Sequence, residues 1–202
     1  MSSAWIQTQS GQQFFPFDPF RNEYRIEDIA HALGNICRFA GHTKEFYSVA
    51  QHCVLVSKNV LPEFSRWGLL HDAAEAYFGD LPSPIKSIMP EYHAVEHQTA
   101  ALIADAFGIT LDPEMELAVK MVDRLVFWAE VAQLMQPVHP DLRHQMKEVG
   151  IGDQGPDIKI TPLPPAQASA LFLNRFQELW PDKNKESRDE DALGFMENQN
   201  RT

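Results

Sequence analysis

The sequence predicts an all-α protein built as one domain, preceded by a short extended arm. Three observations support this. Apolar residues recur at intervals of three and four over most of the chain, which is typical of amphipathic helices. Helix start and stop residues stand at the ends of these segments. The length of 202 residues, 44% of them hydrophobic and 22% charged, suits one globular domain with a sizeable core.

Residues 1–25 are predicted to form the arm. The segment 5–24 is rich in Phe, Pro and Gly and has no helical periodicity. Gly11 is expected at a turn, while Pro16 and Pro19 limit the length of any strand. We therefore expect an extended arm or a short hairpin.

Helices are predicted to fill residues 26–180. The first is expected to begin at Ile26 and to end at Gly41. Ser48 is a suitable N-cap for the second. The third is expected to open at Pro62 and to stop at Gly79.

The second half of the chain is predicted to alternate between helices and loops. The segment LPSPIK cannot continue a regular helix because of Pro82 and Pro84. Residues 137–165 hold several Pro and Gly and are expected to form a long loop. Further helices are expected at about 90–107, 113–135 and 165–180. The polar tail 181–202 carries a charged run and is predicted to be disordered.

Composition and charge exclude several classes of partner. A net charge of −11 argues against non-specific nucleic-acid binding, which needs a basic surface. The N-terminus lacks a secretory pattern, and no stretch approaches the ~20 apolar residues that cross a bilayer. Cys37 and Cys53 form no CxxC pair and are expected to be reduced thiols. We therefore expect a cytoplasmic protein without membrane or nucleic-acid partners.

Four polar residues stand where a helical protein would place apolar side chains: His52, His71, Asp72 and Asp123. An ionised carboxylate buried without a partner costs several kcal/mol, so it needs compensation. Imidazole nitrogen together with carboxylate oxygen suits zinc, cobalt, manganese, iron or nickel. The sequence therefore predicts a divalent transition-metal site with positions left for water or phosphate. The alternative is a helical interaction protein whose buried His and Asp pair with each other.

Three segments carry a resemblance to a known family: FYSVAQH (46–52), LLHDAAEAYFGDLPSPIK (69–86) and VKMVDRL (119–125). They resemble the signature of the HD-domain phosphohydrolase superfamily over roughly residues 26–135. The sequence is most similar to its small single-domain nucleotide hydrolases, which include bacterial 5′-deoxynucleotidases of the YfbR type and phage dATP triphosphohydrolases of the DatZ type. The resemblance implies an HD-domain helical bundle, with His52, His71, Asp72 and Asp123 as metal ligands. It also implies a homo-oligomer, a dimer or higher.

Further site residues are expected around these ligands. The resemblance implies that Glu75 positions or deprotonates the attacking water, with Asp80 as a second carboxylate. Capping or solvation is the alternative for both. Candidate substrate contacts are Arg38, Phe39, Lys86 and Lys120, because phosphate needs cations and a base can stack on an aromatic ring. Phe39 could equally belong to the core.

The substrate expected from this resemblance is a deoxynucleotide. A deoxynucleoside triphosphate, with dATP favoured, would be cut between the 5′-oxygen and the α-phosphate, with additional Mg²⁺ on the phosphates. A 5′-deoxynucleotidase acting on monophosphates uses the same site chemistry and remains an alternative. A non-catalytic nucleotide-binding module is a further alternative from another class.

Overall fold

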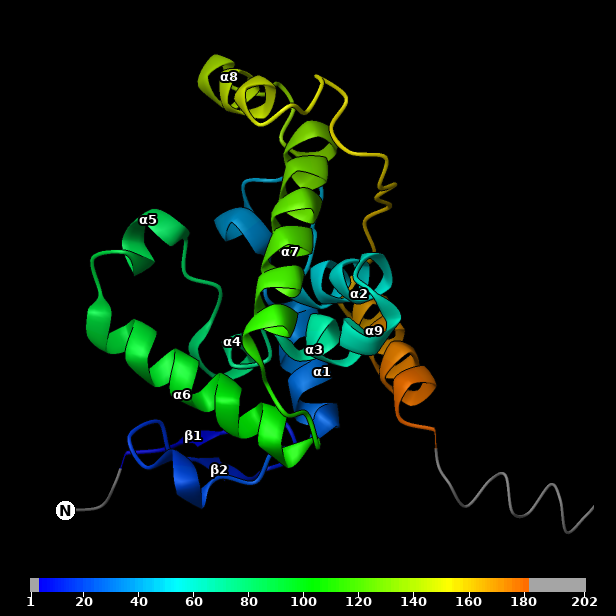
Figure 1. Cartoon of the computed structure of the whole chain (residues 1–202). Coiled ribbons are helices and arrows are strands. Elements are labelled where there is room, and N and C mark those ends of the chain that lie inside the picture. Colours follow the sequence, from blue (N-terminus) through cyan, green and yellow to red (C-terminus); the bar gives the residue numbers. More distant parts are fainter. Residues whose placement is uncertain (1–3, 182–202) are drawn as a thin grey trace, which may run out of the picture.

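The computed structural model describes residues 4–181 as a single helical domain with a two-stranded hairpin at its N-terminal end (Figure 1). Its helices are α1 (Ile26–Asn35), α2 (Val49–Asn59), α3 (Ser65–Leu70), α4 (Glu75–Phe78), α5 (Ser83–Lys86), α6 (Pro90–Ala106), α7 (Pro113–Leu134), α8 (Pro140–Glu148) and α9 (Pro165–Leu179). The strands are β1 (Ile6–Gln7) and β2 (Gln13–Phe14), and short 3-10 turns lie at η1 (Pro19–Arg21), η2 (Arg38–Gly41) and η3 (Pro62–Phe64). The predicted all-α class is confirmed. Residues 182–202, most of the predicted tail, lie outside the described range.

The hairpin packs on the helical domain. β1 pairs with β2 in antiparallel register, and Gly11 has a φ of +86°, as its turn requires. Phe14 is buried and stacks on Tyr77 with ring centroids 4.1 Å apart. The backbone N–H and hydroxyl of Ser10 both donate to Asp28, each at 2.7 Å. These contacts attach the arm to α1 and α4.

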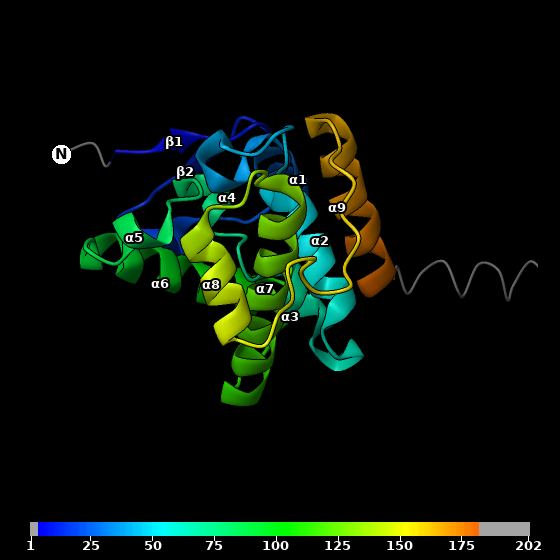
Figure 2. The same cartoon turned by 90° about the horizontal axis from the view of Figure 1, so that it is seen from above.

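Helix α2 lies at the centre of the domain, in contact with α1, α3, α7 and α9. Ser48 caps it as predicted, because its hydroxyl accepts from the Gln51 N–H. Most of the helix is buried, including Val49, His52 and Cys53. Figures 1 and 2 both show α9 on one side of α2, and α5 with α6 on the opposite side of the domain. The helix that carries His52 therefore has little solvent around it.

The first predicted helix is longer than the observed helix α1. It ends at Asn35 rather than Gly41, because the next residues hydrogen-bond to the segment before α2. The Arg38 N–H donates to the Tyr47 carbonyl at 2.9 Å, and Ile36 accepts from the Val49 N–H at 3.1 Å. This pairing places Arg38 beside the start of α2.

The predicted helix from Pro62 to Gly79 is broken into η3, α3 and α4. Between α3 and α4 the chain makes tight turns, in which the Glu75 N–H donates to the Asp72 carbonyl at 3.0 Å. His71 and Asp72 thus lie in a turn and not in the middle of a helix. Apolar spacing continues through the break, so periodicity could not reveal it. Gly79, with a φ of +83°, ends α4 as expected.

Two segments predicted to be irregular contain short helices. The 137–165 loop includes α8, whose Met146 is buried in a second, smaller core cluster together with Trp128, Val131, Ala132 and Val138. The last four residues of LPSPIK form the single turn α5, because Pro84 stands in its first turn, where no N–H is needed. Among the described residues, no helix is long and apolar enough to span a membrane.

Candidate metal centre

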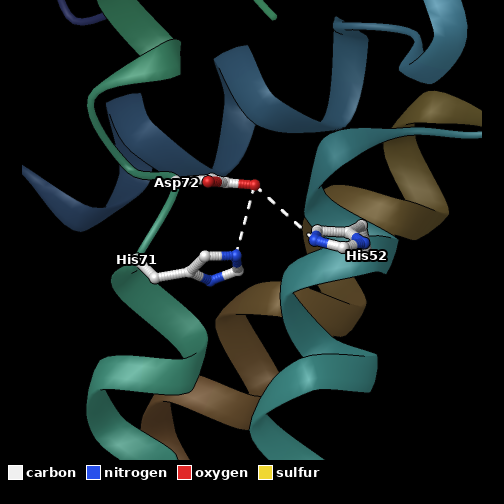
Figure 3. Close-up of side chains that lie close together, drawn as sticks. All are labelled: His52, His71 and Asp72. Atoms are coloured by element: carbon white, nitrogen blue, oxygen red, sulfur yellow. Dashed lines mark ion pairs between the residues drawn. The ribbon is translucent and has the colours of Figure 1, made fainter. Parts of the chain in front are cut away.

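Three of the predicted ligands converge between α2 and the α3–α4 turn (Figure 3). Within residues 4–181, His52, His71 and Asp72 each offer a ligand atom, and these atoms all lie within 4.8 Å of one another. The Asp72 Oδ2 atom is 3.6 Å from the His52 Nε2 atom and 3.3 Å from the His71 Nε2 atom. A shared carboxylate oxygen therefore faces two imidazoles.

The other nitrogen of each imidazole is held by a hydrogen-bond acceptor. His52 Nδ1 lies 2.7 Å from Glu130 Oε1, and His71 Nδ1 lies 3.0 Å from the Gly68 carbonyl oxygen. These acceptors place a proton on each Nδ1, which leaves the Nε2 lone pairs directed at the centre. Neither buried Nε2 atom has a hydrogen-bond partner among the described residues. The donor set therefore fits a metal ion, which would satisfy both nitrogens.

Asp123 reaches the same centre from α7. Its Oδ1 atom is 3.1 Å from His52 Nε2, but its side chain is 39% exposed. Asp123, expected on a buried face, is therefore only partly buried: it lies at the edge of the centre, next to His52, His71 and Asp72. Burial opposes ionisation of Asp123, but the nearby His52 and His71 lower the pKa of its carboxyl.

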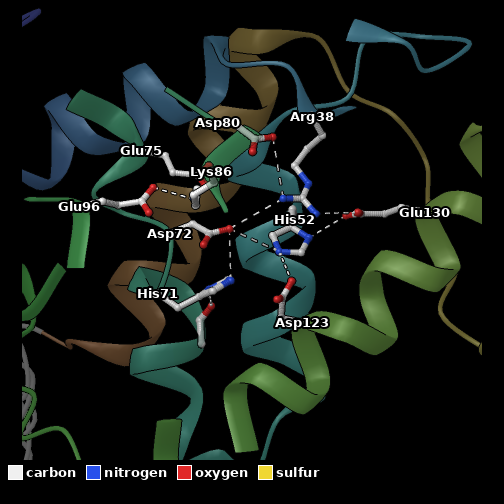
Figure 4. A network of polar contacts seen from close by, with 11 residues as sticks. Arg38, His52, His71, Asp72, Glu75, Asp80, Lys86, Glu96, Asp123 and Glu130 are labelled. Atoms are coloured by element: carbon white, nitrogen blue, oxygen red, sulfur yellow. Dashed lines mark hydrogen bonds and ion pairs between the residues drawn. The ribbon is translucent and has the colours of Figure 1, made fainter. Parts of the chain in front are cut away.

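Glu130 is a member of the site that sequence reasoning missed. Its side chain is fully buried, accepts from His52 Nδ1, and accepts from Arg38 Nη2 at 3.0 Å (Figure 4). The available signal was a glutamate inside the apolar run FWAEVAQL, because a buried charge requires partners. Arg38 also lies 3.9 Å from Asp72 and 4.0 Å from Asp80. Glu130 and Arg38 together fix the side chains around the candidate ligands.

Figure 4 shows Glu75 near Lys86, and Asp80 next to Arg38. Burial raises the pKa of Glu75 well above its usual value, and the neighbouring Asp72 and Asp80 raise it further. Burial also raises the pKa of Asp80, in opposition to Arg38. Lys86 Nζ lies 3.7 Å from Glu75 Oε1 and 2.8 Å from Glu96 Oε1. The structure thus brings both predicted water-site carboxylates and Lys86 next to the centre.

The electrostatic field at the centre favours a cation. Burial and Arg38 act to lower the pKa of His52, yet Glu130 and Asp123 raise it to about 9. Burial opposes ionisation of Asp72, but His71, His52 and Arg38 hold the pKa of that carboxyl well below its usual value. A proton on His52 therefore neutralises part of the carboxylate charge, and a metal ion would replace it.

A cavity of about 150 Å³ opens from the centre toward α6. His71, Asp72, Glu75 and Lys86 line one part of it, and α6 contributes residues that were not among the predicted site residues. These are Glu96, which holds Lys86, and the two histidines His93 and His97. The available signal was the spacing of His93 and His97, which stand four residues apart on one predicted helix.

Three of the four predicted substrate residues do not line this cavity: Arg38, which bonds Glu130, and also Phe39 and Lys120. Lys120 is exposed on α7 and is not among the cavity-lining residues. Phe39 stacks on Phe127 with ring centroids 5.7 Å apart and packs against the second core cluster. The core alternative for Phe39 therefore matches its contacts.

Comparison with known proteins places the chain in a family. No protein-family model matches it. It is 35% identical over 187 residues to the uncharacterized protein YfdR of Escherichia coli K12, covering 87% of this chain and 96% of YfdR. The chain belongs to the YfdR family. An uncharacterized protein of Rhodobacter capsulatus is also similar to it, 32% identical over 146 residues, which are 66% of this chain and 74% of that protein. The YfdR match extends over nearly the whole of both chains, so this family shares the domain and not one segment of it.

Proposed function

We propose that the chain is a metal-dependent nucleotide phosphohydrolase of the HD-domain superfamily. The observation that carries the proposal is the pair of imidazoles whose buried Nε2 atoms face Asp72 while acceptors hold their Nδ1 atoms. This arrangement points both Nε2 atoms at the centre, where a bound metal ion would take the place of a proton. The order His52, then His71-Asp72, then Asp123 is also the ligand order that the superfamily resemblance implies.

The proposed ligands of the ion are His52, His71, Asp72 and Asp123. When bound, a divalent transition metal supplies an acidified water and polarises a phosphoryl oxygen. Four protein ligands leave positions for that water and the substrate, as catalytic sites require. Zinc, cobalt, manganese, iron and nickel all suit this mixture of imidazole and carboxylate ligands.

Glu75 and Asp80 are proposed to orient the attacking water and to accept its proton. The raised pKa of Glu75 makes its carboxylate a stronger base than an exposed glutamate, which suits general-base work near neutral pH. Lys86 lies 3.7 Å from Glu75 on the cavity wall, where its ammonium group can bind a phosphate oxygen.

Arg38 is proposed to act mainly through other side chains. Its guanidinium bonds Glu130 and faces Asp72 and Asp80, so its charge is shared among carboxylates. It therefore fixes the positions of Asp72, a proposed ligand, and Asp80, proposed to orient the water, relative to Glu130 on α7. We assign it a positioning role, in addition to any phosphate contact.

A deoxynucleoside triphosphate, with dATP favoured, is the proposed substrate. The test is to load metal-free protein with each candidate metal and to incubate it with each dNTP and dNMP, resolving phosphate from triphosphate. Release of triphosphate from dATP is the expected result. Phosphate release from monophosphates would instead support a 5′-deoxynucleotidase, and nucleotide binding without product would support a non-catalytic binding module.

Asp72→Ala provides the structural control for this assay. It removes the carboxylate that faces both imidazoles, so metal binding and hydrolysis should be lost together. Full activity in this variant would refute the assignment. If the wild-type protein takes up no transition metal and binds no nucleotide, a helical interaction protein is the better description.

A further inference from the structure

A second cavity, of about 330 Å³, lies between α2, α9 and the segment 159–163, on the side of the domain where α9 packs against α2 (Figure 2). Gln51 fixes the wall that this segment forms. Its side-chain amide donates to the Thr161 carbonyl at 3.0 Å, and its amide oxygen accepts from the Leu163 N–H at 2.9 Å. Much of the lining is apolar: Val54, Leu55, Ile160, Leu163 and Leu171.

The charge of this cavity is opposite in sign to that of the chain. Its charged lining residues are Lys58 and Lys159, both exposed, and the described lining includes no Asp or Glu. The whole chain has a net charge of −11. Apolar walls beside two ammonium groups favour an occupant in which apolar side chains stand next to acidic ones.

The chain itself carries a segment of this kind beyond α9. Residues 189–196 read DEDALGFM, in which three acidic residues precede Leu193, Phe195 and Met196. The other residues of 182–202 are polar, charged or small, so these three apolar side chains are exceptional in their own segment. The segment therefore has the acidic and apolar groups that the cavity favours, side by side.

The end of α9 lies close enough to the cavity for this segment to reach it. Arg175 donates to the Ser57 hydroxyl at 3.0 Å and to the Ser57 carbonyl at 3.2 Å, so α9 adjoins α2 one residue before Lys58. From there to the end of α9 at Leu179 is about 6 Å of helix. Residues 182–192 can span about 35 Å when extended, which exceeds the whole length of α9, about 22 Å.

We propose that segment 189–196 docks in this cavity of its own chain, with its acidic residues on Lys58 and Lys159 and its apolar side chains on the lining. The proposal is independent of the proposed function, because no candidate ligand or water-site residue lines this cavity. A short linker to α9 gives the segment an effective concentration on the order of 1 mM, so individually weak contacts are enough to hold it. The docked segment ties 159–163 and α9 to α2, the helix that carries His52.

Photo-cross-linking in the full chain tests the proposal. Phe195 is replaced by the photoreactive amino acid p-benzoylphenylalanine, and this chain is mixed with an equal amount of the same chain labelled with heavy nitrogen. After irradiation, cross-linked peptides are identified by mass spectrometry. The expected products join position 195 to the cavity lining within one chain. Lys58→Glu/Lys159→Glu should lower their yield about fivefold, the combined effect of several exposed charge pairs, and adding Asp189→Lys/Asp191→Lys should restore it.

Lys44→Glu/Lys147→Glu is the matched control, because it reverses two exposed lysines that do not line the cavity. Its yield should equal that of the unreversed chain, and circular dichroism should show all variants folded. Cross-links to other surfaces, an absence of cross-links, or an unchanged yield in Lys58→Glu/Lys159→Glu would overturn the proposal. Cross-links between a heavy and a light chain would also overturn it, and would assign the cavity to a second copy.

Discussion

Replacing Glu130 by Gln tests whether the buried acceptor behind His52 organises the centre. The side chain is fully buried, with His52 Nδ1 at 2.7 Å and Arg38 Nη2 at 3.0 Å. Gln keeps the shape but removes the charge, so the buried Arg38 loses its closest counter-charge. Breaking a buried ion pair costs about 3–5 kcal/mol. We expect about 3 kcal/mol, the lower end of that range, because Asp72 and Asp80 remain 3.9 and 4.0 Å from Arg38.

The same substitution should also weaken metal binding. Glutamine has one acceptor oxygen for the two donors, His52 Nδ1 and Arg38 Nη2, so it cannot serve both. A disturbed hydrogen bond behind a histidine ligand lowers metal affinity by about 10–100-fold. The assays are urea unfolding of the metal-free protein and calorimetric titration with Zn²⁺. The matched control is Glu178→Gln, which removes a glutamate paired with Arg175 at 2.8 Å on the surface of α9. Its unfolding and titration curves should overlay those of wild type, because an exposed pair contributes little. If Glu130→Gln behaves like Glu178→Gln in both assays, our reading of the network is refuted.

Three further predictions concern proton linkage, catalysis and packing. The pKa of His52 rises from about 6.5 to about 9 in the metal-free fold, so its stabilising contribution is complete below pH 6.5 and lost as pH rises through 9. The free energy of unfolding of the metal-free protein should therefore fall as the pH rises from about 6.5 through about 9. A free energy of unfolding that stays constant over this pH range would contradict the raised pKa of His52. Glu75→Gln should keep metal binding within about twofold while turnover drops about 10²–10⁴-fold, measured by calorimetry and product release; unchanged turnover would remove Glu75 from the mechanism. Gly34→Ala should cost about 1–3 kcal/mol in urea unfolding, because its Cβ would lie 3.0 Å from the Pro165 carbonyl of α9. Gly152→Ala is its control, since a Cβ there meets nothing within 4 Å, and equal stabilities would contradict the close approach.

Helix prediction succeeded where one face of a helix meets the core and a specific residue ends it. Ser48 and Gly79 are examples, since the capping hydroxyl and the left-handed backbone are local properties. It failed where hydrogen bonds from distant segments replaced those of the helix. The backbone of Arg38 bonds Tyr47 instead of continuing α1, and nothing within the first helix signals this.

The same difference between local and distant contacts separates the site residues that could be predicted from those that could not. Residues that are anomalous in their own segment, such as His71 and Asp72 after an apolar run, were accessible to sequence reasoning. Glu130 was missed because its importance lies in contacts 78 and 92 residues away, with His52 and Arg38. Lys120 was selected for its nearness in sequence to Asp123, yet it is exposed and does not line the cavity.

The sequence by itself determined an all-α domain and a set of His and Asp residues whose burial requires compensation, because amphipathic spacing and the cost of burying charge are local in origin. Tertiary structure alone decided which atoms meet. It turned the Nε2 atoms of His52 and His71 toward Asp72, placed Glu130 behind the first imidazole, and brought His93 and His97 of α6 to the opposite wall of the cavity. These relations depend on how separate helices pack, and no pattern within one segment encodes the distance between two others.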